Sequence, residues 1–348
     1  MRTAILGWPQ VGKSSLFKML CGPQAHPEAY GVHVGVARVP DSRLDALAVL
    51  YKPQKTTYAA LEFLDAPPLL NEPEKDAAVL GQVRGAEVFA HVVPLFGDDV
   101  DPGRDVARLE TEFLLVDLDT VDKRREKVVR DAKKAHTAEL DHELAVLEKA
   151  RAALAAERPL RAVTLTPEEH QALRGFMLLS LKPLLVVLNA GDEEAPTLAD
   201  VPAKYDLGKV AGQPQMAVTE VCGKIESELA DLDPAEAEEF LVSYGLHESA
   251  RDRVLHTICS LLGLMTFFTV SEPECRAWLA PAGTVAVEAA GMIHTDFARR
   301  FIKAEVIPWK DLVASGSLAA GREQGRVRLE GKDFHVSDGD VLYIRHTA

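Results

Sequence analysis

The stretch that decides the fold, residues 7–14, reads Gly7-Trp8-Pro9-Gln10-Val11-Gly12-Lys13-Ser14. An apolar run at residues 1–6 precedes it and predicts a buried strand. Leu16, Phe17 and Leu20 follow at the spacing of one helix face, which predicts a helix over residues 13–20. A chance match to the pattern GxxxxGKS seldom has both a strand before it and a helix after it. The sequence therefore predicts a P-loop nucleotide-binding domain.

The loop residues have separate expected roles in phosphate binding. Gly7 and Gly12 allow a sharp turn, so that backbone N–H groups and the N-terminus of the next helix point at the phosphates. Lys13 would reach the β- and γ-phosphates, and the Ser14 hydroxyl would ligate a Mg²⁺ ion that bridges them. The predicted nucleotide-binding residues of this loop are Pro9, Gln10, Val11, Gly12, Lys13, Ser14 and Ser15.

The composition bounds the class of protein. A chain of 348 residues, of which 47% are hydrophobic, is long enough for two or three cores, so we expect several domains. The net charge of −14 limits any contact with nucleic acid to a local basic patch. The four cysteines include no CxxC pair, and no stretch reaches the roughly 18 apolar residues of a membrane span. We therefore expect a cytoplasmic protein with no membrane contact.

Short apolar segments alternate with helical ones in much of the chain. Beyond the first strand, we expect strands at residues 35–39, 59–64, 88–93 and 184–188, and helices at residues 41–50, 75–83 and 251–262. This alternation predicts the α/β class, with a doubly wound and mostly parallel sheet.

Residues 105–158 differ, because they contain scarcely a Gly or Pro and alternate charged with apolar residues at helical spacing. We expect two long antiparallel helices, with a coiled-coil stripe formed by Leu140, Leu144, Leu147 and Leu154. Because the strand at 184–188 comes later, this α-helical hairpin is inserted into the nucleotide domain.

The last part of the chain changes to short strands with turn signals such as Ser337-Asp338-Gly339-Asp340, which predicts a separate small β-rich domain. The predicted division is a nucleotide-binding domain at residues 1–104 and 180–263, the inserted hairpin at 105–179, and the β-rich domain at 264–348.

A second segment is expected to read the nucleotide base. The apolar strand at 184–188 runs into Asn189-Ala190-Gly191-Asp192, which resembles the NKxD motif of GTPases without its lysine. In that motif the Asp carboxylate accepts hydrogen bonds from guanine N1 and N2, a pair of donors that adenine lacks. These four residues alone leave the base open, and they are also ordinary turn residues.

Along essentially its whole length the chain resembles the Obg-like ATPase family, called YchF in bacteria. The resemblance is strongest near the end, in Arg276-Ala277-Trp278, in Ala289-Ala290-Gly291-Met292-Ile293-His294-Thr295-Asp296-Phe297, and in Phe301-Ile302-Lys303-Ala304-Glu305-Val306, which look like that family's C-terminal β-grasp-like TGS domain. Upstream landmarks are Val39-Pro40-Asp41-Ser42-Arg43-Leu44-Asp45 and Lys224-Ile225-Glu226-Ser227-Glu228-Leu229.

This resemblance implies a GTPase-like domain, a helical insertion and a TGS domain. It also implies ATP rather than GTP, because family members carry NxxE where GTPases carry NKxD. Asn189 and Asp192 would take the Asn and acidic places, Ala190 would lie beside the adenine, and the segment that would close over the base is Cys222-Gly223-Lys224. Asp65 matches the Asp of the family's DxxG segment and would hold Mg²⁺ through water.

The chain departs from the family pattern in both loops that respond to the γ-phosphate. Pro68 stands at the Gly of DxxG, where it has no N–H to donate and a fixed φ. Leu69 follows it, and no Thr occupies the metal-binding place in the first switch. We therefore expect that nucleotide binding survives while hydrolysis is slow or absent. The alternative is that another loop, with His33 or His91, restores the chemistry.

A basic helix face is the candidate contact with a ribosome or RNA. It is formed at i, i+4, i+7 and i+11 by Lys123, Lys127, Arg130 and Lys134, although an ordinary solvated face fits the same pattern. We expect a monomeric, YchF-like protein that binds ATP and Mg²⁺ and associates with the ribosome or RNA according to its nucleotide state. The alternatives are a non-catalytic module acting through the hairpin and TGS domain, and a GTP-binding Obg-type switch.

Overall fold

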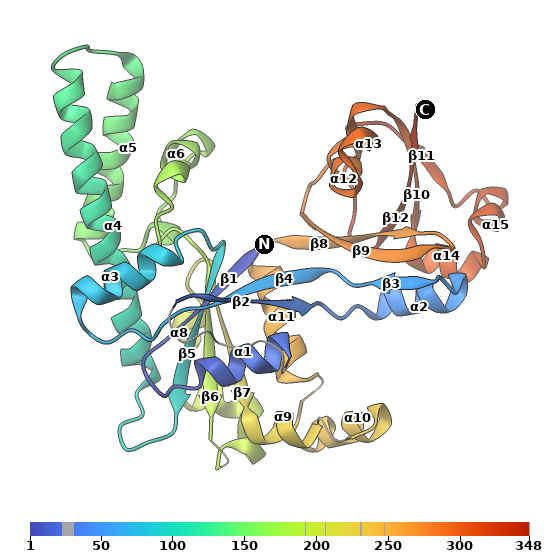
Figure 1. Ribbon diagram of the computed structural model, residues 1–348, viewed down its shortest axis with the longest axis horizontal. Helices are drawn as coiled ribbons and strands as arrows, with labels where there is room; N and C mark the ends of the chain where they lie inside the picture. Colours follow the sequence, from blue (N-terminus) through green and yellow to red (C-terminus); the bar gives the residue numbers. More distant parts are fainter. Residues whose placement is uncertain (23–30, 192, 206, 230–231, 247, 348) are drawn as a thin grey trace. The chain divides into compact units, whose positions relative to one another are not determined.

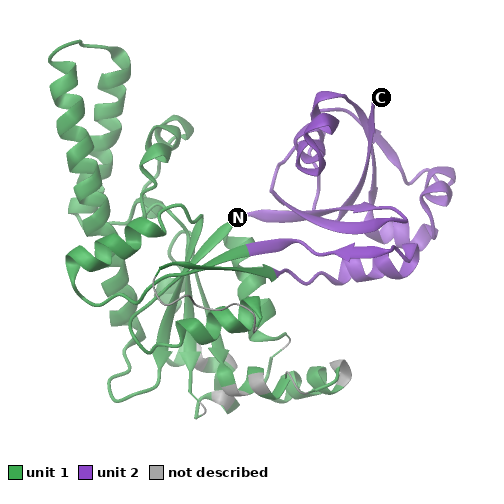
Figure 2. Ribbon diagram, viewed as in Figure 1, with its two compact units in different colours: residues 1–37, 62–261 green, residues 38–61, 262–348 purple. Residues whose placement is uncertain are grey.

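The computed structural model describes residues 1–22, 31–191, 193–205, 207–229, 232–246 and 248–347. The chain forms two compact units, one of residues 1–37 and 62–261 and the other of residues 38–61 and 262–348 (Figure 2). Among the described residues, none of the helices has the length and apolar character needed to cross a bilayer.

A six-stranded sheet forms the centre of the first unit (Figure 1). Its strands, in spatial order, are β2 (His33–Arg38), β4 (Ala60–Asp65), β1 (Arg2–Leu6), β5 (Val88–Leu95), β6 (Leu184–Ala190) and β7 (Met216–Cys222). The pairs β1–β4, β1–β5, β5–β6 and β6–β7 are parallel, so the carboxyl ends of these strands meet at one edge. The predicted mostly parallel sheet is confirmed, and ligands of such sheets bind at this edge.

Helix α1 (Lys13–Cys21) follows β1 directly, and its buried face carries Leu16, Phe17 and Leu20 as the sequence predicts. The other helices of this part of the unit are α3 (Pro73–Gln82), α7 (Val201–Lys204), α8 (Gly208–Ala211), α9 (Gly223–Leu229), α10 (Pro234–Ser243) and α11 (Ala250–Leu261), with the short 3₁₀ helix η3 (Ala195–Asp200). The predicted helices at 75–83 and 251–262 correspond to α3 and α11.

The predicted hairpin is confirmed as α4 (Pro102–Ala132) and α5 (Ala138–Ala155), shown in green in Figure 1. Leu147 and Leu154 are buried in its core, where they pack with Val121 and Val128 of α4. Because α4 ends at Ala132, Lys134 lies in the turn, and the predicted basic face does not extend to it.

Buried polar contacts hold the base of the hairpin. The Asp117 carboxylate, fully buried on α4, accepts hydrogen bonds from the N–H groups of Leu179 (2.8 Å) and Ser180 (2.7 Å). The buried Arg161 side chain pairs with Glu110 of α4. The segment that contributes Leu179, Ser180 and Arg161 contains η1 (Leu160–Ala162), α6 (Pro167–Leu173) and η2 (Arg174–Phe176). Since a buried charge is stable only with partners, these contacts fix where α4 leaves the sheet.

The second unit contains another six-stranded sheet. In spatial order its strands are β11 (Arg328–Glu330), β10 (Phe301–Pro308), β12 (Asp340–His346), β8 (Leu264–Val270), β9 (Glu274–Pro281) and β3 (Lys55–Thr57). Its helices are α2 (Ser42–Tyr51), α12 (Ala286–Ile293), α13 (Thr295–Arg299), α14 (Trp309–Ser315) and α15 (Leu318–Glu323).

Residues 38–61 belong to this second unit, whereas the predicted division places them in the nucleotide domain. β3 pairs in parallel with β9, and Leu44 and Leu47 of α2 are buried in the same core as Phe268. The Arg43 guanidinium also bridges Asp41 and Asp338. The periodicity of this segment predicts its helix correctly, but periodicity does not indicate which core a helix joins.

Candidate functional site

The loop of residues 7–12 joins β1 to α1 in the conformation that its glycines allow. Gly12 has φ 96° and caps the N-terminus of α1, and Gly7 has φ 153°. A Cβ atom at Gly7 would lie 2.9 Å from the Val92 carbonyl oxygen, and one at Gly12 would lie 2.1 Å from Asn189 Nδ2. Both positions therefore require glycine for reasons of space as well as of φ.

Lys13 at the start of α1 and Asp65 at the end of β4 both lie at the carboxyl edge of the sheet. Burial lowers the pKa of Lys13, and the charge of Asp65 opposes this shift. Burial also raises the pKa of Asp65, against the charges of Lys13 and His33 and a hydrogen bond from Ser14. Each group is the main nearby partner of the other, as in a site prepared for an anion on one side and a cation on the other.

The surroundings of Asp65 fit a Mg²⁺ ion. Its Oδ2 lies 3.5 Å from Ser14 Oγ, and its Oδ1 is buried with no hydrogen-bond partner among the described residues. Mg²⁺ commonly takes one or two protein oxygens and completes its shell with water and phosphate oxygens. A buried carboxylate oxygen without a partner, beside a serine hydroxyl, matches this requirement. Among the described residues, no three His, Cys, Asp or Glu side chains gather as an all-protein metal cage.

The carboxyl end of β6 contacts the phosphate loop directly. Asn189 Nδ2 donates a hydrogen bond to the Val11 carbonyl oxygen at 2.9 Å, although 178 residues separate the two. Ala190 is buried, and Cys222 Sγ lies 3.8 Å from the Gly191 carbonyl oxygen. Asn189 thus ties the two loops together. Asp192, the expected acidic residue of this segment, lies outside the described residues.

These elements enclose a cavity of about 390 Å³ at the N-terminus of α1. It is lined by Gly12, Ser15, Leu16, Met19, Val92, Asn189, Val221, Gly223 and Glu226. Four predicted residues line the cavity, namely Gly12, Ser15, Asn189 and Gly223. Pro9 and Gln10 are exposed residues of the loop, whereas Ala190 and Cys222 are buried and do not line the cavity.

The five other lining residues were not predicted as site residues, and they are Leu16, Met19, Val92, Val221 and Glu226. Met19 and Val221 add apolar surface to the cavity, and Glu226 adds a carboxyl group that accepts a hydrogen bond from the Ala250 N–H at 2.8 Å. Met19 could have been found one helical turn after Ser15, on the same side of α1. Val221 and Glu226 flank Cys222-Gly223, but nothing in their local pattern indicates a site.

The loop after β4 is held by hydrogen bonds of its own. The Leu69 N–H donates to the Gly7 carbonyl oxygen at 3.2 Å, and the Leu69 side chain is fully buried. Asp76, also fully buried, accepts from the N–H groups of Leu70 (2.7 Å) and Glu72 (3.2 Å). With Pro68 having no N–H, the backbone donors at residues 69, 70 and 72 are all engaged within the protein.

The two histidines considered as substitutes for a catalytic group differ in position. His91 is fully buried on β5, both its ring nitrogens lack a partner among the described residues, and burial lowers its pKa to about 3. An imidazole with this pKa stays neutral and has no route to a bound water. His33 begins β2 and is close enough to affect the pKa of Asp65.

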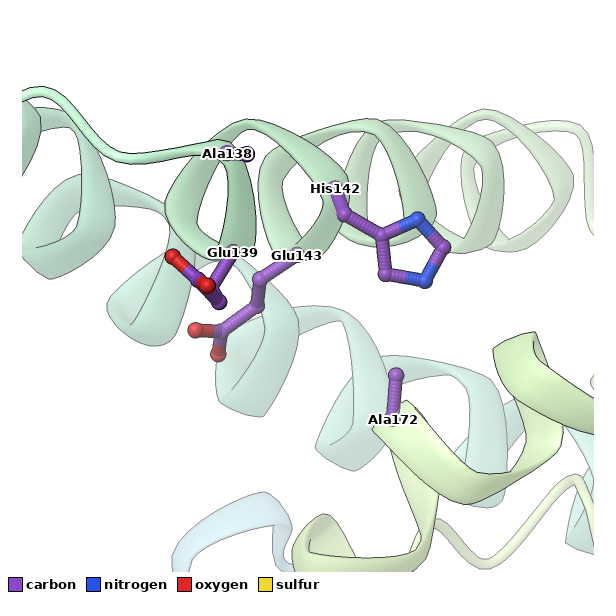
Figure 3. A pocket seen from close by; sticks show the side chains of 5 residues that line it. All are labelled: Ala138, Glu139, His142, Glu143 and Ala172. Carbon is purple, nitrogen blue, oxygen red and sulfur yellow. The ribbon is translucent and has the colours of Figure 1, made fainter.

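A second hollow, on the helical hairpin, is a weaker candidate (Figure 3). It measures about 570 Å³ and is lined by Ala138, Glu139, His142, Glu143 and Ala172. Glu143 is already engaged by Arg124, whose Nε and Nη2 lie 2.6 and 2.8 Å from its two carboxylate oxygens. The other two polar residues, Glu139 and His142, are exposed on α5, so this hollow gives a ligand little shelter from water.

Comparison with known proteins agrees with this geometry. The family model YchF-GTPase_C, described as a protein of unknown function (DUF933), matches residues 264–347. The chain is 37% identical to the "Ribosome-binding ATPase YchF" of Bacillus subtilis, with 99% of each chain covered. It is 36% identical to the protein of the same name from Escherichia coli O157:H7, with 98% of each covered.

A solved structure shows the same fold over nearly the whole length. The Schizosaccharomyces pombe YchF GTPase superposes with a TM-score of 0.83 at 25% identity, covering 99% of this chain and 97% of that one. These similarities cover nearly the whole chain. They include the P-loop GTPase-like domain, the inserted hairpin and the C-terminal domain that the family model matches. The chain therefore belongs to the YchF family.

Proposed function

We propose that this protein binds ATP with Mg²⁺ in the cavity at the N-terminus of α1, hydrolyses it slowly, and associates with the ribosome. The observation that carries the proposal is the loop at this helix N-terminus, where Gly7 and Gly12 have positive φ and Asn189 bonds to Val11 beside a cavity of about 390 Å³. Lys13 and Asp65 lie near enough for the charge of each to shift the pKa of the other. The relatives from Bacillus subtilis and Escherichia coli, which are named ribosome-binding ATPases, support it. Ribosome association would place the protein in the cytoplasm.

In this proposal the residues from Pro9 to Ser15 surround the phosphates. The N–H groups at the start of α1 donate to phosphate oxygens, and the Lys13 ammonium neutralises their charge. Ser14 binds Mg²⁺ through its hydroxyl and Asp65 through a water molecule. When bound, the ion would neutralise negative charge between the β- and γ-phosphates.

The base would lie at the other end of the cavity, near Asn189 and Gly223. The side-chain amide of Asn189 donates to the phosphate loop, so its role is to hold the two loops together. Ala190 stands where GTPases have a lysine, and this supports ATP over GTP. Asp192 takes the acidic place, while Cys222 supports the segment that covers the base.

Slow hydrolysis is supported by the loop after β4. A γ-phosphate sensor needs a backbone N–H that is free to turn toward the phosphate. Pro68 has none, the Leu69 N–H is bonded to Gly7, and Asp76 holds the next donors. Leu69 is also buried and apolar, so it cannot orient water. We propose that this loop stays in one conformation during the nucleotide cycle.

Ribosome association would use exposed cations of the hairpin. Lys127 and Arg130 are exposed on α4, and Lys123 is exposed but forms an ion pair with Asp119 at 2.7 Å. Lys134 adds a charge in the turn rather than on the helix face. These groups can bind RNA phosphates despite the negative net charge, because salt screens the rest of the surface beyond about 10 Å.

The test is calorimetry with Mg²⁺ and non-hydrolysable analogues of ATP and GTP, with phosphate release followed in parallel with ATP itself. Wild type is compared with Lys13→Ala and with the control Lys18→Ala, which changes an exposed lysine of the same helix. We expect ATP-analogue binding in wild type and Lys18→Ala, its loss in Lys13→Ala, and little phosphate release.

Each other outcome supports a different function. Rapid phosphate release by wild type would refute slow hydrolysis, and preferential binding of the GTP analogue would favour an Obg-type switch. The absence of binding to either analogue would leave a non-catalytic module that acts through its hairpin and C-terminal domain. The buried Leu69 is the observation that favours this second function.

A further inference from the structure

The second residue of the phosphate loop contacts the helical hairpin. Trp8 is 7% exposed, and the guanidinium carbon of Arg108 on α4 lies 3.9 Å from the centroid of its indole ring. Trp8 Nε1 is buried without a hydrogen-bond partner among the described residues. The indole is therefore held by packing and by the cation above it, because its own polar group contributes no bond.

The same stretch of α4 lies near α3, the helix that follows the loop after β4. One helical turn beyond Arg108, burial raises the pKa of Glu112, the charge of Asp76 raises it further, and the charge of Arg108 lowers it. Glu112 thus lies within electrostatic reach of both groups. Asp76 is the residue that holds the N–H groups of Leu70 and Glu72.

About one turn of α4 therefore carries Arg108 over Trp8 of the phosphate loop and Glu112 near Asp76 of α3, which holds the loop after β4. The two loops are also joined to each other by the hydrogen bond from the Leu69 N–H to the Gly7 carbonyl oxygen. Glu110, between Arg108 and Glu112, and Asp117, further along the helix, fix α4 to the rest of the unit. Arg108 is thus carried on a rigid element, as a positioning group must be.

We propose that Arg108 is a positioning residue for the phosphate loop, which it holds in the nucleotide-binding conformation through Trp8. This inference rests on the proposed function of the site. The loop contains Gln10 at φ 64° and Gly12 at φ 96°, a backbone that few residues adopt without support. The apparent affinity of the protein for nucleotide is proportional to the fraction of molecules in which this loop is correctly formed. The affinity therefore falls when that fraction falls.

The expected size of the effect follows from the stacking geometry. A cation over an indole face stabilises an arrangement enough to change an equilibrium by about three- to tenfold at a partly exposed site. Arg108 is half-buried, so its removal leaves room for water and should not prevent folding. We therefore expect Arg108→Ala to weaken binding of an ATP analogue by about three- to tenfold.

The experiment measures the dissociation constant of the Mg²⁺-bound analogue by calorimetry for five proteins besides wild type. These are Arg108→Ala, Arg108→Lys, Trp8→Leu, the double variant Trp8→Leu with Arg108→Ala, and the control Arg104→Ala. Arg104 is an exposed arginine of the same helix, one turn before Arg108, and it pairs with Asp99. Melting temperatures without nucleotide are recorded for all of them.

Arg108→Lys should restore most of the affinity, because an ammonium group also binds an aromatic face. Arg104→Ala should bind as wild type does. In the Trp8→Leu background, Arg108→Ala should have little further effect, since the residue acts through the indole. A purely structural role would instead lower the melting temperature and leave the dissociation constant unchanged.

The inference is overturned if Arg108→Ala binds the analogue as tightly as wild type, or if it weakens binding equally in both backgrounds. If Arg108→Ala does not fold, Arg108→Lys is compared with Trp8→Leu instead. The inference is then overturned if these two variants bind the analogue with the same affinity. If wild type binds neither analogue, the proposed function itself fails. If wild type binds the analogue and the Arg108 variants bind it equally well, only the inference about Arg108 is refuted and the proposed function stands.

Discussion

Replacing Asp76 should release the loop after β4 without unfolding the domain. Asp76→Ala removes a fully buried carboxylate that accepts two backbone N–H groups, at 2.7 and 3.2 Å. A hydrogen bond to a charged group contributes about 1.5–3 kcal/mol. Part of this loss is offset in Asp76→Ala, because the variant no longer has to bury a charge. We therefore expect the loop to open more easily by about 2–3 kcal/mol.

Hydrogen exchange followed by mass spectrometry measures this change locally. A difference of about 2–3 kcal/mol corresponds to roughly 30- to 150-fold faster exchange of the amides at residues 70 and 72. Asp76→Asn keeps one acceptor oxygen and should produce a smaller acceleration. Glu74→Ala, an exposed neighbour on the same helix, is the matched control and should leave exchange unchanged.

The reasoning would be refuted if exchange in Asp76→Ala stayed within about threefold of wild type, because the two hydrogen bonds would then contribute almost nothing. It would also be refuted if exchange accelerated equally throughout the sheet strands, since the carboxylate would then stabilise the whole domain rather than the loop.

Three further changes test other parts of the molecule. Pro68→Gly restores an N–H donor and a free φ at this position. Phosphate release should therefore rise by up to about tenfold, while the affinity for nucleotide stays the same. An unchanged rate of phosphate release would show that this proline does not limit hydrolysis. Burial lowers the pKa of Lys182 to about 8 from 10.5, so the unfolded chain binds more protons between these values. The free energy of unfolding should therefore increase as the pH rises from 8 to 10.5, and this gain should disappear as the pH falls back to 8. Urea titrations measure this free energy, and Lys182→Met should make its increase with pH smaller. Reversing the charges of Lys127 and Arg130 to Glu should weaken co-sedimentation with ribosomes and reduce its salt dependence by roughly two phosphate contacts, whereas equal binding at every salt concentration would exclude this face.

The parts of the fold that depend on local chemistry were predictable. The strand, the loop and the helix around Gly12 and Lys13 follow from spacing and from turn residues, which act over a few positions. The hairpin follows in the same way from leucines such as Leu147 and Leu154, which recur along one helix face. The missing N–H at Pro68 is also a property of one residue type, and it needs no coordinates.

The assignment of residues 38–61 to the second unit was not predictable from the sequence. Its helix has an ordinary periodicity, but its three-residue strand β3 was not predicted, and the partner strand β9 lies more than 200 residues later in the chain. The end of α4 at Ala132, which removes Lys134 from the basic face, depends on where the hairpin turns. Both outcomes are set by packing between distant segments rather than by local propensity.

The sequence by itself determined the phosphate loop, the parallel sheet and the inserted hairpin, because the residues responsible are neighbours along the chain. Only the tertiary structure decided that Asn189 bonds to Val11, that Asp76 holds the loop after β4, and that Arg108 covers Trp8. These contacts join residues that are adjacent only after folding. The hydrogen-bonding groups or charge of a side chain do not show which distant residue will contact it. The conformation of the site, unlike its location, therefore depends on the complete packing of the first unit.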